Sequence, residues 1–388
     1  MRIVTSSAST VARVDSIPAA EWNALGDGRD PFTRHEFLVT LERTGCVGGE
    51  TGWSPCFVTL RDSRGLAAAA PAWLKTHSYG EFVFDFAWAQ AYARHRLAYY
   101  PKLVVGVPFT PAMGPRLLVR ADLDRAAMTQ KLLDSIETTV REQGLSSAHV
   151  LFPCENDRAA LASRTEWLER RDCQFHWHNS GYATFEDFLA SFTAEKRKKA
   201  RRERRRVAEA GITFERRYGH ELSREEILTA WTLHRVTFLR RGNEPYLGAE
   251  TFIELARVLG ESMLFVLARL AGEIVAVAVF FVGDDTLYGR YWGAAEQHHS
   301  LHFETCYHQG IEHCIERGIA RFEPGTQGEH KVSRGFEPRY THSAHYIVEP
   351  RFRAAIADYL AREIEAVEAY AAGIQAHVPY KQTLDTPS

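Results

Sequence analysis

The sequence of 388 residues contains no long hydrophobic run. No window approaches the roughly 18 uninterrupted apolar residues that a membrane-spanning helix needs, and the first residues, MRIVTSSASTVARVDS, lack the apolar centre of a secretory signal peptide. The six cysteines form no CxxC pair and have no regular spacing, which is typical of reduced thiols in an intracellular protein. We therefore expect a cytoplasmic protein with no membrane span.

Several nucleotide-binding and catalytic motifs are also missing. There is no GxxxxGK[ST], no GxGxxG after a strand and no GxSxG, so the sequence does not predict a nucleotide hydrolase, a Rossmann domain or an α/β hydrolase. The Arg-x-x-Gly-x-Gly/Ala motif that binds pyrophosphate in acetyl-CoA-dependent acetyltransferases is absent, and residues 296–302 stand in its expected place. We predict no metal site, because no cysteine or carboxylate follows the FHWHN histidines, His176 and His178, at ligand spacing.

Length and an internal similarity together predict two domains of one kind. A single hydrophobic core rarely exceeds about 250–300 residues. Segments 135–153 and 310–325 share a helix with Ile-Glu, a charged last turn, a glycine and a short apolar strand, and both follow a hairpin and a third strand. We predict an α/β (α+β) fold with domains 1–178 and 179–349, each a mixed, mostly antiparallel sheet flanked by helices. Residues 350–388 would form a C-terminal helix and tail that pack back on the domains.

The stretch from Thr286 to Phe336 has the pattern of a ligand-binding unit. Thr286–Gly293 predicts a strand, the spacing of apolar residues from about Ser300 to Gly318 predicts a helix, and Ala320–Glu323 predicts a second strand. A glycine-rich polar loop follows. Loops at the carboxyl ends of strands are where such sheets hold ligands, so we expect the site here.

The polar loop GEHKVSRGF (Gly328–Phe336) supplies most of the catalytic candidates. Lys331 is a compact cation suited to a phosphate or a developing oxyanion, and Glu329 and His330 could move protons near neutral pH. Glu304, in the first turn of the expected helix, is a further candidate base, or simply a favourable charge at the helix N-terminus. The alternative is a loop whose charges face water.

The most basic stretch is KRKKARRERRR, Lys196–Arg206, within a long helix that we predict over Thr184–Ala210. Nine of its eleven residues are basic, so a helix cannot place all the charge on one face, and an anion would relieve the repulsion. Phosphate groups of a nucleotide, a nucleic acid or a cofactor are the candidates. No aromatic residue interrupts the run, so it does not predict a base-stacking platform. A solvated helix surface is the alternative.

Five stretches, spread over nearly the whole chain, resemble the bacterial predicted N-acyltransferases of the Fem-like, peptidoglycan biosynthesis/recognition group. They are PAWLKTHSYGEFVFD (Pro71–Asp85), YYPKL with PFTP and GPRLL (Tyr99–Leu118), the basic helix after Phe192, LYGRYWG (Leu287–Gly293) and GEHKxxRGF. That group is related to Fem-type transferases, which attach amino acids from aminoacyl-tRNA to the peptide of a lipid- or nucleotide-linked cell-wall precursor. The resemblance therefore implies two tandem acetyltransferase (GNAT)-like domains.

The resemblance also implies roles for individual residues. Lys331 matches the loop lysine that lies near the acyl donor. Lys75 is the counterpart of a basic residue that holds precursor phosphate, and Arg197 and Arg201 match arginines of the helix that opens the second domain. Further candidate substrate-binding residues in these stretches are Lys199, Tyr291 and Arg334.

Together these features predict direct acyl transfer to an amine, without a covalent enzyme intermediate and without a permanently bound cofactor. Backbone N–H groups and Lys331 would stabilise the oxyanion. The basic run favours aminoacyl-tRNA as donor over acyl-CoA, and the acceptor amine could be carried by a phosphate-linked precursor. The other interpretation is a non-catalytic phosphate- or RNA-binding protein on the same scaffold. The sequence leaves the oligomeric state and the identity of the acceptor open.

Overall fold

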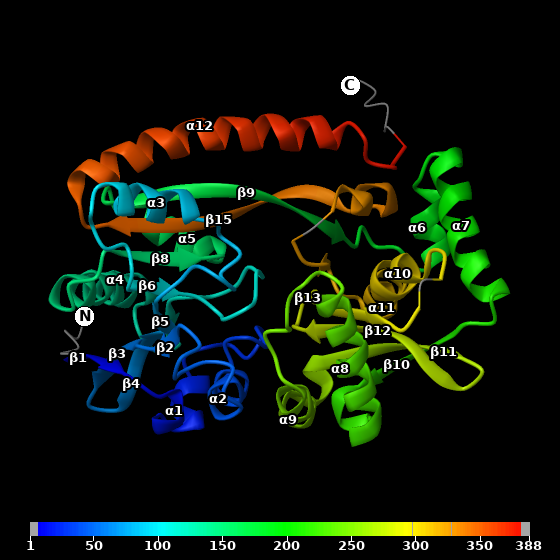
Figure 1. The fold of residues 1–388 in the computed structure, drawn as a ribbon, viewed down its shortest axis with the longest axis horizontal. Helices are drawn as coiled ribbons and strands as arrows, with labels where there is room; N and C mark the ends of the chain where they lie inside the picture. Colours follow the sequence, from blue (N-terminus) through cyan, green and yellow to red (C-terminus); the bar gives the residue numbers. More distant parts are fainter. Residues whose placement is uncertain (1–6, 297, 327, 382–388) are drawn as a thin grey trace. The chain divides into compact units, whose positions relative to one another are not determined.

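The computed structural model describes residues 7–296, 298–326 and 328–381, and its chain divides into two compact units (Figure 1). Unit 1 consists of Met1–Asp172, Tyr246–Thr251 and Tyr340–Glu368, and unit 2 of Cys173–Pro245, Phe252–Arg339 and Ala369–Ser388. The expected first boundary lay at residue 178, whereas unit 1 ends its first segment at Asp172. The expected separate C-terminal segment, 350–388, is shared between the two units.

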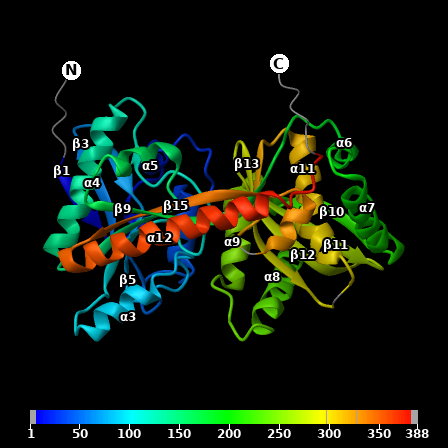
Figure 2. The ribbon, with the colours of Figure 1, turned by 90° about the horizontal axis from the view of Figure 1, so that it is seen from above.

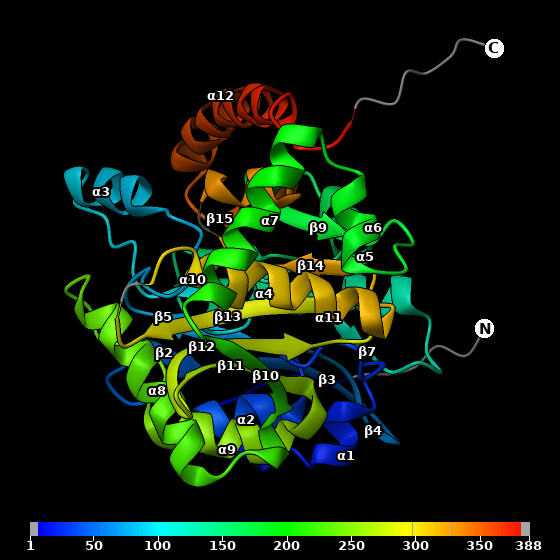
Figure 3. The ribbon, with the colours of Figure 1, turned by 90° about the vertical axis from the view of Figure 1, so that its right-hand side faces the viewer.

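Unit 2 is built on a sheet with the strand order β10–β11–β12–β13–β14–β9. Every neighbouring pair with a described register is antiparallel except β13 and β14, which are parallel. In Figure 3, α10 and α11 cover one face of this sheet and α8 and α9 the other. The strands are β9 (Trp167–His178, of which 173–178 belong to this unit), β10 (Thr213–Tyr218), β11 (Met263–Leu270), β12 (Glu273–Val282), β13 (Thr286–Ala294) and β14 (Arg321–Glu323). The helices are α6 (Phe185–Ala190), α7 (Ala194–Glu209), α8 (Arg224–Leu239), α9 (Ala249–Leu259, of which 252–259 belong to this unit), α10 (Leu301–Phe303) and α11 (Gln309–Arg317).

Unit 1 has two sheets, ordered β1–β3–β4–β7 and β15–β8–β6–β5–β2. Its strands are β1 (Ser7–Val11), β2 (Trp53–Pro55), β3 (Phe57–Asp62), β4 (Gly65–Ala70), β5 (Ala72–Lys75), β6 (Lys102–Val105), β7 (Leu118–Val119), β8 (Ser147–Leu151) and most of β15 (Glu337–Ile347). Its helices are α1 (Ala19–Asn23), α2 (His35–Arg43), α3 (Phe86–Arg94), α4 (Arg125–Glu142), α5 (Glu155–Ala162) and the first part of α12 (Pro350–Gln375). Figure 2 shows α3 standing at the edge of this unit.

The two units repeat one order of elements. Each begins with a strand (β1, β10), continues through two helices into a long hairpin (β2/β3 with β4/β5, β11 with β12), and adds a third antiparallel strand (β6, β13). A helix then leads to a strand parallel to the third (β8, β14). The closing antiparallel strand comes from the other half of the sequence, since β15 pairs with β8 and β9 with β14. The prediction of two like α/β domains with mostly antiparallel sheets flanked by helices is confirmed.

The central strands of unit 2 have continuous apolar sequences because both of their faces are buried in the core. Helices cover both faces, so β11 (MLFVLARL) and β12 (EIVAVAVFFV) are buried on both sides. The predicted apolar stripe of α11 is confirmed: Ile311 and Cys314 are fully buried against this sheet. Gly318 ends the helix in the left-handed conformation, as the pattern predicted.

The single helix predicted over Thr184–Ala210 is wrong, because the chain forms α6 and α7 with a break between them. Phe192 lies in the break and is fully buried in the core of unit 2. Thr193 donates its backbone N–H to the carbonyl oxygen of Pro379 at 2.9 Å. Both contacts are with residues distant in sequence, so helical periodicity could not reveal them.

Residues 79–85 form no strand, and α3 begins directly after them at Phe86. The segment turns because Glu81 and Asp85 point inward to the ammonium group of Lys102. A buried charge cluster of this kind competes with sheet pairing and leaves no mark in local sequence periodicity.

At Gly293 strand β13 lies very close to helix α8, so a substitution at this position tests the contact between them. A Cβ atom at this position would lie 2.1 Å from the carbonyl carbon of Leu233. We expect Gly293→Ala to force the helix away from the sheet and to lower the unfolding free energy by about 1–3 kcal/mol, measured by urea denaturation. Gly373→Ala is the matched control, since a Cβ there meets nothing within 4 Å, and it should be neutral or slightly stabilising. Equal stability of the two variants would contradict the contact.

Candidate functional site

Lys331 lies in a 3₁₀ turn, Glu329–Arg334, that follows β14 at the place where a polar loop was predicted. The side chain is only 2% exposed, and its Nζ donates to the carbonyl oxygen of Gly325 at 2.5 Å. Within the described ranges no carboxylate pairs with it. Burial lowers the pKa of Lys331 to about 7, despite a small opposing effect of Cys306. The amine can therefore gain or lose a proton near neutral pH, as catalytic lysines do.

His330 is exposed and lies beside Lys331. Its Nε2 atom is 2.8 Å from the hydroxyl oxygen of Tyr307, and its ring packs 5.8 Å from the rings of both His302 and Phe303. Partial burial, together with the charges of Lys331 and Arg334, lowers its pKa, so the neutral imidazole prevails at neutral pH. This neutral ring can accept a proton.

The turn itself depends on Gly328. Its φ of +102° is in the region that favours glycine, and a Cβ there would lie 2.0 Å from the His330 ring. The next residue, Glu329, is exposed, and its carboxylate accepts a hydrogen bond from the hydroxyl of Tyr370 at 2.9 Å. Glu329 therefore lies on the outer side of the turn rather than beside the Lys331 amine.

Glu304 opens a π-helical turn, Glu304–His308, between α10 and α11. Turns of this kind are frequent at functional sites. Burial by itself would raise the pKa of Glu304, but the hydrogen bond from His308 and the charge of Arg204 outweigh it and hold the pKa at about 2. A carboxylate that is ionised and 3.0 Å from a guanidinium is a weak base. The structure therefore argues against Glu304 as the proton acceptor and for a role in fixing Arg204.

A pocket of about 420 Å³ adjoins the Lys331 turn. Its wall residues His302 and Phe303 are the same residues on which the His330 ring packs. The pocket also holds arginines and an indole, a combination that binds anionic groups attached to planar rings. The lining residues are Thr237, Arg240, Arg241, Trp292, Ala294, Glu296, His298, Ser300, Leu301, His302 and Phe303. None of these residues was predicted individually as a site residue from the sequence. Trp292 lies within the motif LYGRYWG, and Arg240 and Arg241 belong to no recognisable motif.

The basic helix α7 contacts this site through its inner face. Glu203 is buried and accepts a hydrogen bond at 2.7 Å from Arg334, which lies in the same 3₁₀ turn as Lys331. Arg334 also donates to the carbonyl oxygen of His330 at 2.6 Å. Arg204 pairs with Glu304 at 3.0 Å and with Glu312 at 3.1 Å. Arg334, predicted to bind substrate, thus joins the turn to α7.

Most of the other basic side chains of α7 are exposed, and some of them are also paired. Arg201 pairs with Glu186 at 2.6 Å on the surface, and Arg197 donates to the carbonyl oxygen of Phe192 at 3.2 Å. Lys199 is exposed. The exposed face of α7 consists of Lys198, Lys199, Arg201, Arg202, Arg205 and Arg206. Figure 2 shows α7 beside α6 at the end of unit 2.

Tyr291, the last candidate in this unit, follows a bulge in β13. Its ring lies 4.9 Å from that of His234 on α8 and 5.1 Å from that of Phe252 on α9. These contacts place the tyrosine against the helices α8 and α9, away from the Lys331 turn.

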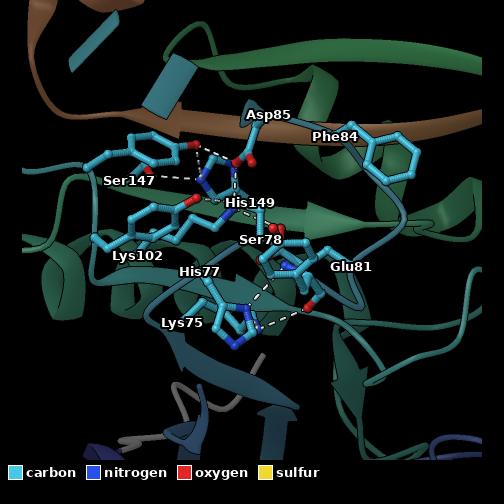
Figure 4. A network of polar contacts seen from close by, with 12 residues as sticks. Lys75, His77, Ser78, Glu81, Phe84, Asp85, Lys102, Ser147 and His149 are labelled. Carbon is cyan, nitrogen blue, oxygen red and sulfur yellow. Dashed lines mark hydrogen bonds and ion pairs between the residues drawn. The ribbon is translucent and has the colours of Figure 1, made fainter. Parts of the chain in front are cut away.

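Lys75, the candidate in unit 1, is fully buried at the end of β5 (Figure 4). Its Nζ lies 3.8 Å from the centre of the Trp53 ring and donates to the carbonyl oxygen of Tyr79 at 3.3 Å. Nδ1 of His77 is 3.4 Å away. Burial lowers the pKa of Lys75 to about 7, although the charge of Glu81 opposes the effect. The side chain is enclosed rather than open to a ligand.

A second buried lysine, Lys102, is the centre of the same network and was not singled out in the sequence, although it lies in the YYPKL motif. Its Nζ is 2.8 Å from Glu81 and 2.8 Å from the hydroxyl of Ser78, and it forms a short ion pair with Asp85 (Figure 4). Burial raises the pKa of Glu81 to about 7. For Asp85 burial is outweighed by the charge of Lys102, which lowers the pKa to about 2.

The histidines of FHWHN lie within residues 7–296, 298–326 and 328–381, the ranges that the structure describes. No group of three or more His, Cys, Asp and Glu side chains in these ranges could hold a metal ion. His176 instead contacts Gln174 at 3.2 Å. Likewise, none of the described helices has the length and apolarity to cross a bilayer.

The buried amine of Lys331 predicts a pH-dependent stability difference. Because its pKa of about 7 in the folded protein lies below the unfolded value of 10.5, the unfolded chain binds the proton more tightly. The cost of burial is fully present below pH 7 and is lost as the pH rises towards 10.5. We expect Lys331→Met to be more stable than wild type at pH 7, with the gap closing by up to roughly 1.4 kcal/mol per pH unit above it.

Urea denaturation at several pH values measures this gap. Val332→Ala is the control, because it removes buried methyl groups at the next position without removing a titrating group. Its difference from wild type should not change with pH. A pH-independent gap for Lys331→Met would contradict the lowered pKa.

The buried Glu203–Arg334 pair predicts a second stability effect. Glu203→Gln leaves the guanidinium of Arg334 buried without its charged partner, so we expect a loss of about 3 kcal/mol. The double variant Glu203→Gln/Arg334→Met should recover part of it, as a double-mutant cycle would measure. Glu195→Gln, an exposed position on the same helix, should change stability by less than about 0.5 kcal/mol. Additive effects of the two substitutions would show that the pair is not coupled.

Comparison with known proteins identifies the family to which the chain belongs. No curated protein matches it. Among solved structures, it resembles the C-terminal domain of a protein described as a lysylphosphatidylglycerol synthetase from Agrobacterium fabrum (12% identity, covering 89% of this chain and 95% of that chain, TM-score 0.53). It also resembles FemX (12%, 88% and 98%, TM-score 0.53) and a conserved protein of unknown function from Bacteroides thetaiotaomicron (12%, 88% and 99%, TM-score 0.51).

At these identities the structural likeness concerns the fold alone. The family model is more specific, because it matches residues 13–382, almost the whole chain. The chain belongs to the FemAB-like family, described as peptidoglycan biosynthesis/recognition.

Proposed function

We propose that the protein moves an acyl or aminoacyl group from an activated donor to an amine acceptor by direct attack, with Lys331 at the reacting carbonyl. The observation that carries this proposal is the buried Lys331 amine, whose pKa is about 7 and which has no carboxylate partner in the described ranges. It lies in a turn that shares a wall with a pocket containing two arginines. A protonated amine in so dry a place stabilises an oxyanion far better than it would in water.

In this mechanism the acceptor nitrogen attacks the donor carbonyl and forms the new C–N bond. The carbonyl oxygen becomes an oxyanion, to which Lys331 donates. When the oxyanion collapses, the bond between the carbonyl carbon and the leaving oxygen or sulfur breaks. The attacking nitrogen loses its proton to Nδ1 of the neutral His330 ring, in the tautomer whose Nε2–H donates to the hydroxyl oxygen of Tyr307. The imidazolium then gives this proton to the leaving atom.

We propose aminoacyl-tRNA as the donor, in preference to acyl-CoA. The exposed cations of α7, such as Lys198, Lys199 and Arg202, suit a polyanion. The pocket of about 420 Å³ is large enough for the end of a nucleotide, with Trp292 for stacking and Arg241 for a phosphate. Family membership favours an acceptor amine on a cell-wall peptide precursor.

The same exposed face of α7 supports a second candidate, a phosphate- or RNA-binding protein without catalysis. This alternative uses the cations of the helix and gives the Lys331 turn no chemical role. An enzyme should therefore lose turnover when Lys331 is replaced, whereas a binding protein should lose affinity when the α7 cations are replaced.

Incubation with charged tRNA and, separately, with a panel of acyl-CoAs tests the proposal, with mass spectrometry detecting transfer to amine acceptors. Lys331→Ala should lower kcat by about 100-fold or more, because one oxyanion donor is lost, while donor binding is retained. In the wild type kcat/KM should fall as the pH rises through about 7, because the ammonium group is lost. Lys331→Arg should shift this fall to higher pH.

The double variant Lys198→Gln/Lys199→Gln distinguishes an enzyme from a non-catalytic binding protein. For an enzyme this double variant should raise KM for tRNA and reduce the salt dependence of binding, with kcat little changed. Glu209→Gln, at an exposed position of the same helix, is the control. Absence of any transfer product from every donor, together with tRNA binding that depends on the α7 lysines, would favour the non-catalytic protein.

A further inference from the structure

Residues 76–98 of unit 1 expose large apolar side chains that its core does not use. Tyr79 is 65% exposed, Phe84 62%, Phe86 37% and Leu97 45%. The aromatic rings contact one another: Tyr79 lies 5.6 Å from Phe86, and Phe84 stacks on Phe86 at 6.1 Å. Scattered single apolar residues need no explanation on a protein surface, but a contiguous aromatic group is typical of a binding surface.

The segment is held in this outward orientation by the polar network beneath it. Glu81 and Asp85 point inward to Lys102, so Phe84 and Phe86, on either side of Asp85, point outward. The carbonyl oxygen of Phe84 accepts a hydrogen bond from Arg170 at 2.9 Å. Figure 4 shows Phe84 projecting away from the charged cluster. The hydrogen bonds and ion pairs of this network therefore hold the aromatic rings at the surface, and their exposure does not come from local unfolding of the segment.

Helix α3 continues the same surface. Trp88 and Tyr92 form its buried side, while Phe86, Gln90 and Ala93 follow one another at helical spacing on the outer side. Leu97 continues this spacing just beyond the helix. Figures 2 and 3 both show α3 at the outer edge of unit 1.

The exposed charged side chains of residues 76–98 are all positive. Arg94 and Arg96 are exposed at the end of α3, and no exposed residue between 76 and 98 is a carboxylate. The sequence from Phe86 to Ala121 contains no aspartate or glutamate at all. Glu363 of α12, a carboxylate with a described contact to this region, is paired with Arg170 at 2.7 Å. Aromatic and leucine side chains next to arginines, in a segment without exposed carboxylates, are the composition of surfaces that lie in the headgroup region of an anionic bilayer.

We propose that the α3 surface, consisting of Tyr79, Phe84, Phe86, Arg94, Arg96 and Leu97, docks on an anionic lipid bilayer. The rings and Leu97 enter the headgroup region, and the arginines pair with lipid phosphates. A protein partner fits less well, because hot-spot side chains insert into pockets, and the cavity beside Phe84 holds only about 40 Å³. This inference goes beyond the proposed transferase activity and does not depend on it.

Co-sedimentation of the full chain with vesicles tests the proposal. The protein should bind vesicles of phosphatidylcholine mixed with phosphatidylglycerol and bind phosphatidylcholine alone weakly. Arg94→Gln/Arg96→Gln should weaken partitioning roughly 30-fold, from the contribution of two cations near a charged membrane. Phe84→Ser/Phe86→Ser should weaken it about tenfold or more, including at salt concentrations that screen the arginines.

Matched controls distinguish the α3 surface from general stickiness. Tyr340→Ser removes another exposed aromatic of unit 1, and Arg362→Gln removes an exposed arginine of α12. Both should bind like wild type, as should Lys198→Gln/Lys199→Gln on the basic helix. Circular dichroism checks that each variant is folded.

Three results would overturn the inference. The first is no binding to anionic vesicles. The second is vesicle binding that neither α3 double variant weakens, or vesicle binding that only the α7 variant abolishes. The third is a change in oligomeric state, seen by size-exclusion chromatography, when Phe84 and Phe86 are replaced, since this would identify the surface as a contact between two copies of the chain.

Discussion

Two adjacent residues on the inner side of α7 make the arrangement of unit 2 possible. A helix with nine basic residues in eleven positions cannot pack against a protein core unless the charges on its buried face are compensated. Glu203 binds Arg334 of the Lys331 turn, and Arg204 binds Glu304 of the π-helical turn. These pairs fix the two segments that carry the candidate chemistry against one helix, and six of the other cations of α7 are exposed.

The three buried lysines show how neighbours determine the chemistry of one residue type. Lys102 is fully buried, yet Glu81 and Asp85 more than offset the effect of burial and raise its pKa. Lys331 and Lys75 are buried with carbonyl oxygens rather than carboxylates as close acceptors, and their pKa values fall to about 7. Lys102 is therefore a permanent cation that organises the segment below α3, whereas Lys331 is suited to a reaction that needs a proton donor of moderate strength.

The exchange of closing strands determines where the units can be divided. β15 follows unit 2 in sequence but pairs with β8 of unit 1, and β9 follows unit 1 but pairs with β14 of unit 2. A boundary drawn at residue 178 is close to the end of the first segment of unit 1, yet it cannot show that Tyr340–Glu368 also belong to that unit. Strand pairing between distant segments has no local signature, because each strand alone has the same alternating or apolar pattern whichever neighbour it takes.

The sequence by itself determined the duplicated order of elements, the apolar stripe of α11 that ends at Gly318 and the position of the loop with Lys331, because hydrophobic periodicity and glycine placement are local properties. It also indicated the basic helix, but not that the helix breaks at Phe192. Only the tertiary structure decided that Lys331 and Lys75 are buried, that Glu304 is ionised and paired, and that Arg240, Trp292 and His302 line one pocket. Burial, ion pairing and pocket walls depend on which distant segments pack together, and those contacts set the pKa values of Lys331 and Glu304.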